Sequence, residues 1–134
     1  MAENDSTPER VINGCASAGN VMKELWEITA SRLTKKELKW FSGATDVAIF
    51  QAEKLAHTVE LIGCYLNDDT QPDKTTGNRG GWFAGNEPQL LWSIADAVDC
   101  IRGMVYVGGC ASDRLVHPEL YRSLDLSHER ERHV

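Results

Sequence analysis

The sequence is poor in the features that mark several large classes of protein. No apolar run approaches the roughly 20 residues that cross a bilayer, and no long stretch alternates apolar with polar residues as a half-buried strand does. Lys and Arg number 14 against 20 Asp and Glu, so the net charge is −6, which disfavours a strongly basic nucleic-acid binder. With 42% apolar and 25% charged residues, the composition is that of an ordinary globular protein.

The chain is also not dense enough in cysteine for a disulfide scaffold, and its 134 residues suit one domain. The first ten residues are acidic and polar, unlike a secretory signal, so we expect a cytoplasmic protein. Its four cysteines are then expected to be reduced thiols: Cys15, Cys64, Cys100 and Cys110. We expect a flexible N-terminal arm at residues 1–17, a single helical domain at 18–126 and a frayed charged tail at 127–134.

Apolar spacing predicts an all-α fold, a small bundle of four to five helices. The first helix is expected to begin at Asn20 as its cap and to run to Arg32. Thr34 and Glu37 form a capping box, which predicts a second, short helix over 35–42 that is ended or kinked at Gly43. A last short helix is expected to begin at His117 and Pro118.

Two long helices should lie between these short ones, at about 45–66 and 88–107. Gly108 and Gly109 are expected to stop the second long helix. Each long helix carries one apolar seam with alternating spacings of three and four residues: Ala48, Ala52, Leu55, Val59, Ile62 and Leu66, then Leu91, Ile94, Val98, Ile101 and Val105. We therefore predict an antiparallel pair joined by a long Gly-rich loop at 67–87.

The first long helix has a second, weaker apolar stripe, formed by Val47, Phe50, Leu61 and Tyr65. A helix that is apolar on two sides is either central to its bundle or part of an oligomer interface. The sequence leaves a monomer and a homodimer equally open.

The Gly-rich loop is the first candidate functional feature. It places Arg79, Trp82 and Phe83 among glycines, and Trp and Arg dominate binding hot spots. We expect a partner-binding surface formed by these three residues together with Trp92, Asp96 and Asp99. The alternative is that Trp82 and Phe83 fold back onto the helices as a plug.

Polar residues on the long helices suggest a metal site as an alternative. Glu53, His57, Glu60 and Cys64 share one flank of the first long helix, and these residue types bind metals. Such a site also needs ligands from a second element.

Asp96 and Asp99 could supply those ligands. Their segment resembles the second half of the motif of all-α nucleotide pyrophosphohydrolases, which implies a Mg²⁺ that bridges substrate phosphates. The Glu-x-x-Glu half of that motif is absent. This hypothesis predicts that Glu53, Glu60, Asp96 and Asp99 converge on one cavity.

Residues 33–53 resemble the helix-turn-helix of repressor-type DNA-binding proteins. The resemblance implies a first helix at 35–42, a turn at Gly43 and a recognition helix at 45–53. The residues expected to approach DNA are Lys35, Lys36, Lys39, Asp46 and Gln51. Val47 and Phe50 depart from the pattern, because they stand where polar, base-reading side chains belong.

Taken together, these features favour a non-catalytic interaction module that needs no cofactor and no membrane. We expect a regulator or inhibitor that occludes the surface of a protein partner, with a nucleic-acid-binding host complex as one candidate. One candidate among such regulators is an anti-defence (anti-CRISPR-like) protein of a phage or mobile element, an expectation that rests on small size and acidic charge and on no motif. The alternatives are a helix-turn-helix DNA-binding regulator and a Mg-dependent pyrophosphohydrolase-like enzyme.

Overall fold

A computed structural model describes residues 12, 14–69 and 86–132. These residues form five α-helices, one 3-10 helix and no strand, which confirms the all-α prediction. The elements are α1 (Ala18–Thr29), η1 (Ala30–Arg32), α2 (Lys35–Ser42), α3 (Ala44–Asp69), α4 (Glu87–Val116) and α5 (Pro118–Arg132).

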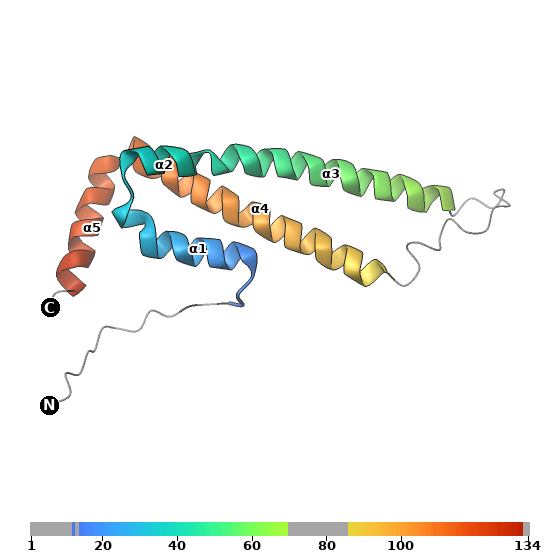
Figure 1. The fold of residues 1–134 in the computed structure, drawn as a ribbon, viewed down its shortest axis with the longest axis horizontal. Helices are drawn as coiled ribbons and strands as arrows, with labels where there is room; N and C mark the ends of the chain where they lie inside the picture. Colours follow the sequence, from blue (N-terminus) through green and yellow to red (C-terminus); the bar gives the residue numbers. More distant parts are fainter. Residues whose placement is uncertain (1–11, 13, 70–85, 133–134) are drawn as a thin grey trace, which may run out of the picture.

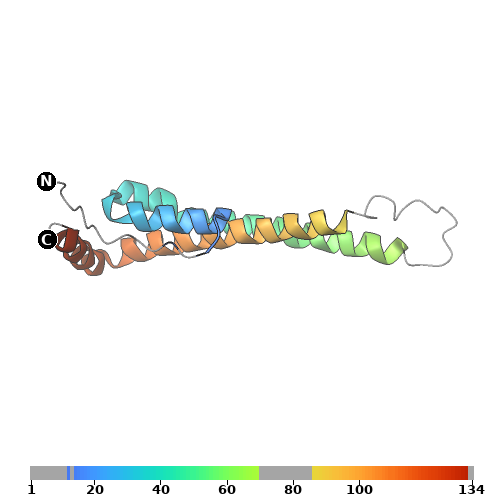
Figure 2. The same ribbon diagram turned by 90° about the horizontal axis from the view of Figure 1, so that it is seen from below.

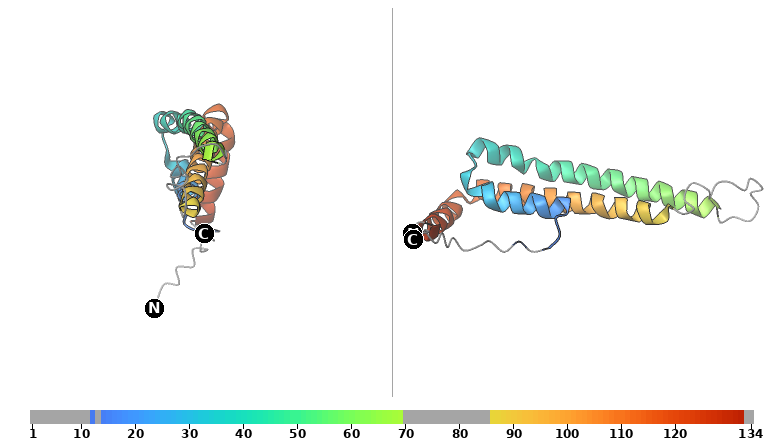
Figure 3. Two further views of the ribbon diagram at one scale, coloured as in Figure 1. Left: turned by 90° about the vertical axis from the view of Figure 1, so that its right-hand side faces the viewer. Right: turned by 60° about the horizontal axis from the view of Figure 1, so that its bottom comes forward.

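The two long helices, α3 and α4, run antiparallel as predicted (Figure 1). In its C-terminal half α4 is flanked by α3 on one side and α1 on the other, while α2 leads into α3 almost along its line. Beyond the start of α1 only α3 and α4 continue, so the molecule is elongated (Figures 2 and 3). We call residues 52–69 of α3 and 87–101 of α4 the arm, and the remaining described helical residues the base.

The base holds the hydrophobic core. Trp26 and Ala30 pack against Val107 and Ala111, and all four are buried. The Trp26 ring meets Phe41 of α2 edge to face, with 5.8 Å between ring centroids. The core therefore joins α1, α2 and the C-terminal half of α4.

Glycine lets the helices of the base approach closely at two crossings. A Cβ added to Gly103 of α4 would lie 2.8 Å from the Cα of Gly19 in α1. A Cβ added to Gly108 would lie 2.6 Å from the backbone nitrogen of Thr45 at the start of α3. No side chain fits at either point, so α4 is held against both neighbours by backbone contact.

This packing corrects the predicted stop at Gly108 and Gly109, because α4 continues through both glycines to Val116. Burial of Gly108 against α3 overrides its weak intrinsic helix propensity. At the other end α4 carries Pro88 in its first turn, as expected.

The short helices match the prediction in part. The capping box of Thr34 and Glu37 is present and opens α2. In contrast, α1 is capped by Ser17, whose hydroxyl accepts from the Asn20 backbone N–H, so the prediction of Asn20 as the cap is wrong. The last helix, α5, continues past residue 126 to Arg132 and takes in much of the segment expected to fray.

Among the described residues, no helix combines the length and the apolar character that a membrane crossing requires. The proposed N-terminal arm at 1–17 lies mostly outside these residues, as does 70–85 of the predicted Gly-rich loop.

Candidate interaction surface

The seam between α3 and α4 is closed at Ala48, in the base, and is open along the arm. Ala48 is fully buried where the helices meet, whereas Val59 is 43% exposed and Val98 is 52% exposed further out. Figure 1 shows the reason, because the two helices separate toward the end of the arm.

The opening is a groove of about 640 Å³, which we call the hairpin groove. It is lined by Ala52, Leu55, Ala56, Val59 and Glu60 of α3 and by Ile94, Val98 and Ile101 of α4. Glu60 is the one charged residue in this lining, so a molecule that fills the groove would meet an almost wholly apolar surface.

The groove lies on the side of α4 away from α1. Ile101 lines the groove and Gly103 contacts α1, and two residues turn a helix by about 200°. Nothing in the base therefore extends along α4 to cover the groove wall formed by Val98 and Ile101.

Trp92 lies on the opposite side of α4. It is 65% exposed and shares its helix face with Gly103, eleven residues or about three turns further on. Because α1 begins only at Ala18, opposite Asp99, it does not reach Trp92. Asp96 is exposed one turn from Trp92, so this predicted pair forms an accessible aromatic and acidic surface.

The predicted second stripe of α3 is also exposed. Phe50 and Tyr65 are both more than half exposed, and the Lys54 ammonium lies over the Phe50 ring at 5.5 Å from its centroid. Trp40 of α2 is the most exposed large apolar side chain of the described residues, at 76%. Exposed aromatic side chains on one helix face, such as Phe50 and Tyr65, are typical of binding surfaces, whereas Trp40 rests edge to face on Phe41, with 5.0 Å between ring centroids.

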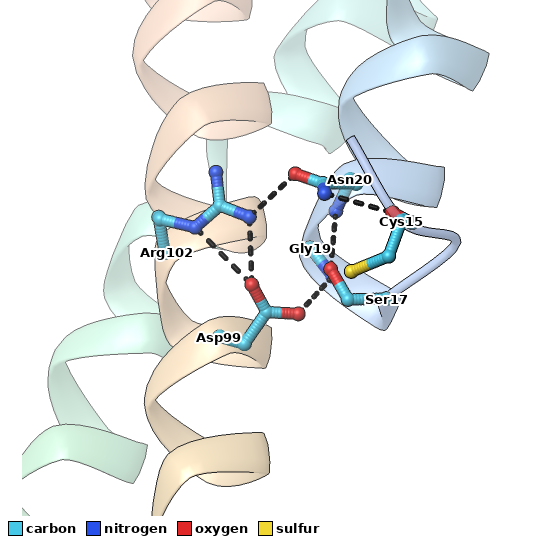
Figure 4. Close-up of polar contacts among 6 residues, drawn as sticks. All are labelled: Cys15, Ser17, Gly19, Asn20, Asp99 and Arg102. Atoms are coloured by element: carbon cyan, nitrogen blue, oxygen red, sulfur yellow. Dashed lines mark hydrogen bonds and ion pairs between the residues drawn. The ribbon is translucent and has the colours of Figure 1, made fainter. Parts of the chain in front are cut away.

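Asp99, which was predicted to contact a partner, joins α1 to α4 within the fold (Figure 4). Its carboxylate accepts from the Gly19 backbone N–H at 2.8 Å and from the Arg102 guanidinium at 2.6 Å. Arg102 also donates to the Asn20 side-chain oxygen at 2.7 Å, and Asn20 donates to the Cys15 carbonyl. An acidic side chain from α4 thus faces the first turn of α1, where helix dipole and free N–H groups favour negative charge.

The electrostatics of this cluster follow from its hydrogen bonds. Arg102 first, and then the Gly19 and Ser17 donors, lower the pKa of Asp99 to about 2. The same partners leave the carboxylate engaged within the fold.

The other carboxylates proposed as metal ligands do not gather around Asp99. Among the described residues, no group of three or more His, Cys, Asp or Glu side chains is placed to hold a metal ion. Glu60 lines the hairpin groove, whereas Asp96 and Asp99 lie toward the α1 side of α4. The convergence of Glu53, Glu60, Asp96 and Asp99 predicted by the pyrophosphohydrolase hypothesis is therefore not found, and His57 is exposed on α3.

The residues of the helix-turn-helix hypothesis lie on two successive helices. The lysines Lys35, Lys36 and Lys39 are exposed on α2, and Asp46 and Gln51 are exposed on α3. The implied recognition helix is the beginning of a 26-residue helix, and Gly43 joins it to α2 almost in line rather than folding it across α2 (Figure 1). This arrangement differs from the one that the resemblance implies.

A smaller hollow of about 280 Å³ lies between η1, α2, α4 and α5. Arg114 and Asp125 form an ion pair in its lining, at 3.0 Å, and the Arg114 guanidinium stacks over the Tyr121 ring. The Tyr121 hydroxyl donates to Asp113, which raises the pKa of Tyr121. These side chains tie α5 to α4.

All four cysteines are free, as predicted. Cys110 is partly buried beside Tyr106, and burial raises the pKa of its thiol. The Tyr106 hydroxyl donates to Glu27 of α1, and burial together with this bond raises the pKa of Tyr106.

Three predicted partner-binding residues, Arg79, Trp82 and Phe83, lie outside the described residues. The hairpin groove was not anticipated as a site, although its lining includes much of both predicted seams. The spacing of a seam indicates which side of a helix faces a neighbour, but it does not indicate how far apart the two helices stand.

Comparisons with protein-family models, with curated proteins and with solved structures find no match to the chain.

Proposed function

We propose that the protein is a non-catalytic interaction module, a regulator or inhibitor that acts by covering the surface of a protein partner. The observation that carries this proposal is the exposure of the arm. Its large apolar side chains are 43% exposed or more at Val59, Leu61, Tyr65, Leu66, Leu91, Trp92 and Val98.

Exposure on this scale is unusual for a helical pair of a compact monomer. Burial of an apolar side chain contributes about 1.5–3 kcal/mol, so leaving a series of them in water forfeits a large part of the free energy of folding. Contiguous exposed apolar surface marks interaction sites in soluble proteins. The arm therefore has the character of a surface that is completed by a partner.

Trp92 and Asp96 are the residues that we assign to contact with the regulated partner. Tryptophan is the residue type most enriched in binding hot spots, and the acidic neighbour favours a partner with basic surface. A basic surface is what a nucleic-acid-binding complex presents to its ligand, so an acidic regulator can compete there. The net charge of −6 supports such steering.

The test is a pull-down from the cells that make the protein, with nuclease treatment and at two salt concentrations. Wild type is compared with Trp92→Ala, and with Trp40→Ala as a matched control in the base. We expect wild type and Trp40→Ala to capture the same protein, and Trp92→Ala to bind it about 30-fold more weakly, or about 2 kcal/mol.

Equal capture by all three proteins would reject Trp92 as the anchor. Capture of no protein at either salt concentration would overturn the proposed function. Capture of nucleic acid alone, weakening with salt, would replace it with the DNA-binding alternative.

A further inference from the structure

The two walls of the hairpin groove differ in the size of their side chains. The α3 wall includes Ala52, Ala56 and Val59, and the same stripe continues along the helix through Ile49, Gly63 and Leu66 at spacings of three and four residues. The α4 wall is formed by Ile94, Val98 and Ile101, and its stripe continues through Leu91 and Val105 at the same spacing. Half of the α3 stripe consists of small residues, at Ala52, Ala56 and Gly63, whereas every residue of the α4 stripe is branched.

Both walls thus repeat every seven residues, which is the spacing by which helices pack against other helices in bundles. In α3 this stripe shares Ala52, Val59 and Leu66 with the seam toward α4 and extends that seam sideways through Ile49, Ala56 and Gly63. An apolar face this broad has room for two helical neighbours, and the described part of the chain supplies only one of them in the arm.

A second copy of the chain supplies the missing neighbour. Related by a two-fold axis along the arm, it would set its branched α4 wall, with Val98 at the centre, on the small-residue α3 wall around Ala56. The same contact repeats on the other side of the axis, so the interface is closed. The groove offers no row of charges that would select a different partner, because Glu60 is the one charged residue of its lining.

The area is sufficient for a specific dimer. Ile49 to Leu66 spans about 25 Å, and two helices side by side are about 20 Å wide, which gives a flat footprint of about 500 Å² per copy. Two copies cover about 1,000 Å² before side-chain relief is counted, which reaches the size of a specific interface.

We infer that the hairpin groove is covered by the same face of a second copy, so that two arms form an antiparallel four-helix bundle. This inference rests on the proposed function, because both treat the arm as an interaction surface. It identifies a second copy of the chain as the molecule that covers the groove side of the arm. The Trp92 side stays accessible in such a dimer.

The test is the mass of the purified chain in solution, by sedimentation and by light scattering, from about 1 to about 100 µM. We expect twice 14.9 kDa over the upper part of this range. A single-chain mass throughout would overturn the inference whatever the variants do. That outcome would not bear on the proposed function, which the pull-down with Trp92→Ala tests separately. A failure of the dimer inference can therefore be distinguished from a failure of the proposed function.

Two substitutions place the interface. Val98→Glu would put a carboxylate into the groove of each copy and should raise the Kd by more than about 100-fold. Val47→Glu is the matched control, because Val47 is 45% exposed on the other stripe of α3, and it should leave the Kd unchanged. Circular dichroism checks that both variants keep their helices.

Ala56→Leu distinguishes a close-packed interface from an unspecific apolar association. A larger apolar side chain should weaken a close-packed interface and strengthen an unspecific one. A dimer that survives Val98→Glu, or that Ala56→Leu strengthens, would place the interface elsewhere and overturn the inference.

Discussion

Single residues determine how closely the helices of the base approach. Gly108 and Gly109 are adjacent in α4, yet only Gly108 touches another element. A Cβ at Gly108 would meet the Thr45 hydroxyl oxygen at 2.2 Å and its backbone nitrogen at 2.6 Å, whereas a Cβ at Gly109 meets nothing within 4 Å.

The neighbouring glycines therefore provide an internally controlled prediction. Gly108→Ala should lower the free energy of unfolding by about 1–3 kcal/mol, because the backbone of α3 cannot move aside easily. Gly109→Ala should raise it by about 0.5–1 kcal/mol, through helix propensity alone. Urea denaturation of both variants measures the two effects, and effects of the same sign would contradict the packing described.

Asp99 predicts a dependence of stability on pH. Its pKa of about 2 in the folded chain is below the value of about 3.9 expected in the unfolded chain, so the folded state favours the carboxylate. The stabilisation is fully present well above pH 4 and is lost as the pH falls toward 2.

Asp99→Asn should therefore lower the melting temperature at pH 7 and have much less effect near pH 2. Calorimetry of wild type and variant over this range measures the difference. Glu53→Gln, an exposed carboxylate of α3, is the control and should show no such convergence. If the difference in melting temperature between wild type and Asp99→Asn stays constant with pH, the hydrogen bonds of Asp99 do not depend on its charge.

At the scale of elements, the capping box was a reliable sequence signal. The Glu37 carboxylate accepts from the Thr34 backbone N–H at 2.7 Å, and this bond lowers the pKa of Glu37. The Thr34 hydroxyl accepts in turn from the Glu37 backbone N–H. Both bonds are local, so the sequence contains all the information needed to predict them.

Thr34→Ala should destabilise the fold by about 1 kcal/mol, because it leaves a backbone N–H of α2 without its partner. Glu37→Gln should cost less, since a glutamine side chain can still reach the Thr34 N–H. Chemical denaturation of the two variants measures the order. A larger loss for Glu37→Gln would mean that charge, and not the hydrogen bond, makes the contribution.

Signals that depend on distant contacts were less reliable. The glycine pair appeared to end α4 because glycine is a poor helix former, but the contact with Thr45 outweighs that preference. Ser17 and Asn20 are both good caps by residue type, and the local bond from the Asn20 N–H to the Ser17 hydroxyl sets the start of α1 at Ala18. For the glycine pair, the deciding partner lies far away in the sequence.

For the whole molecule, the sequence predicted the all-α class and the antiparallel pair of long helices. The predicted seams are only partly covered, because Ala48 is buried whereas Val59, Leu91 and Val98 are 43% exposed or more. The sequence also placed Trp92 and Asp96 on a surface, where they are exposed. It did not predict the groove, because the distance between α3 and α4 in the arm is set by contacts made in the base.

The difference between base and arm predicts uneven protection from hydrogen exchange. Amides of α1 and of the C-terminal half of α4 should exchange slowly at any protein concentration, because they surround the core. Amides of the arm should become more protected as concentration rises and a second copy covers the groove.

Hydrogen exchange read by mass spectrometry, at about 1 and about 100 µM, measures this change. Val98→Glu should remove the concentration dependence in the arm and leave the base as it is. Protection that rises equally in base and arm would point to an interface other than the groove.

The crossing of Gly108 over Thr45 has a mechanical consequence. It is the contact about which α4 would turn relative to α3, and the end of α4 at Glu87 lies about 32 Å away from it along the helix. A rotation of α4 by about 5° at this crossing displaces that end by about 3 Å, which is comparable to the radius of a side chain. A substitution at this crossing should therefore change the distance between α3 and α4 at the end of the arm, although it touches neither wall of the groove.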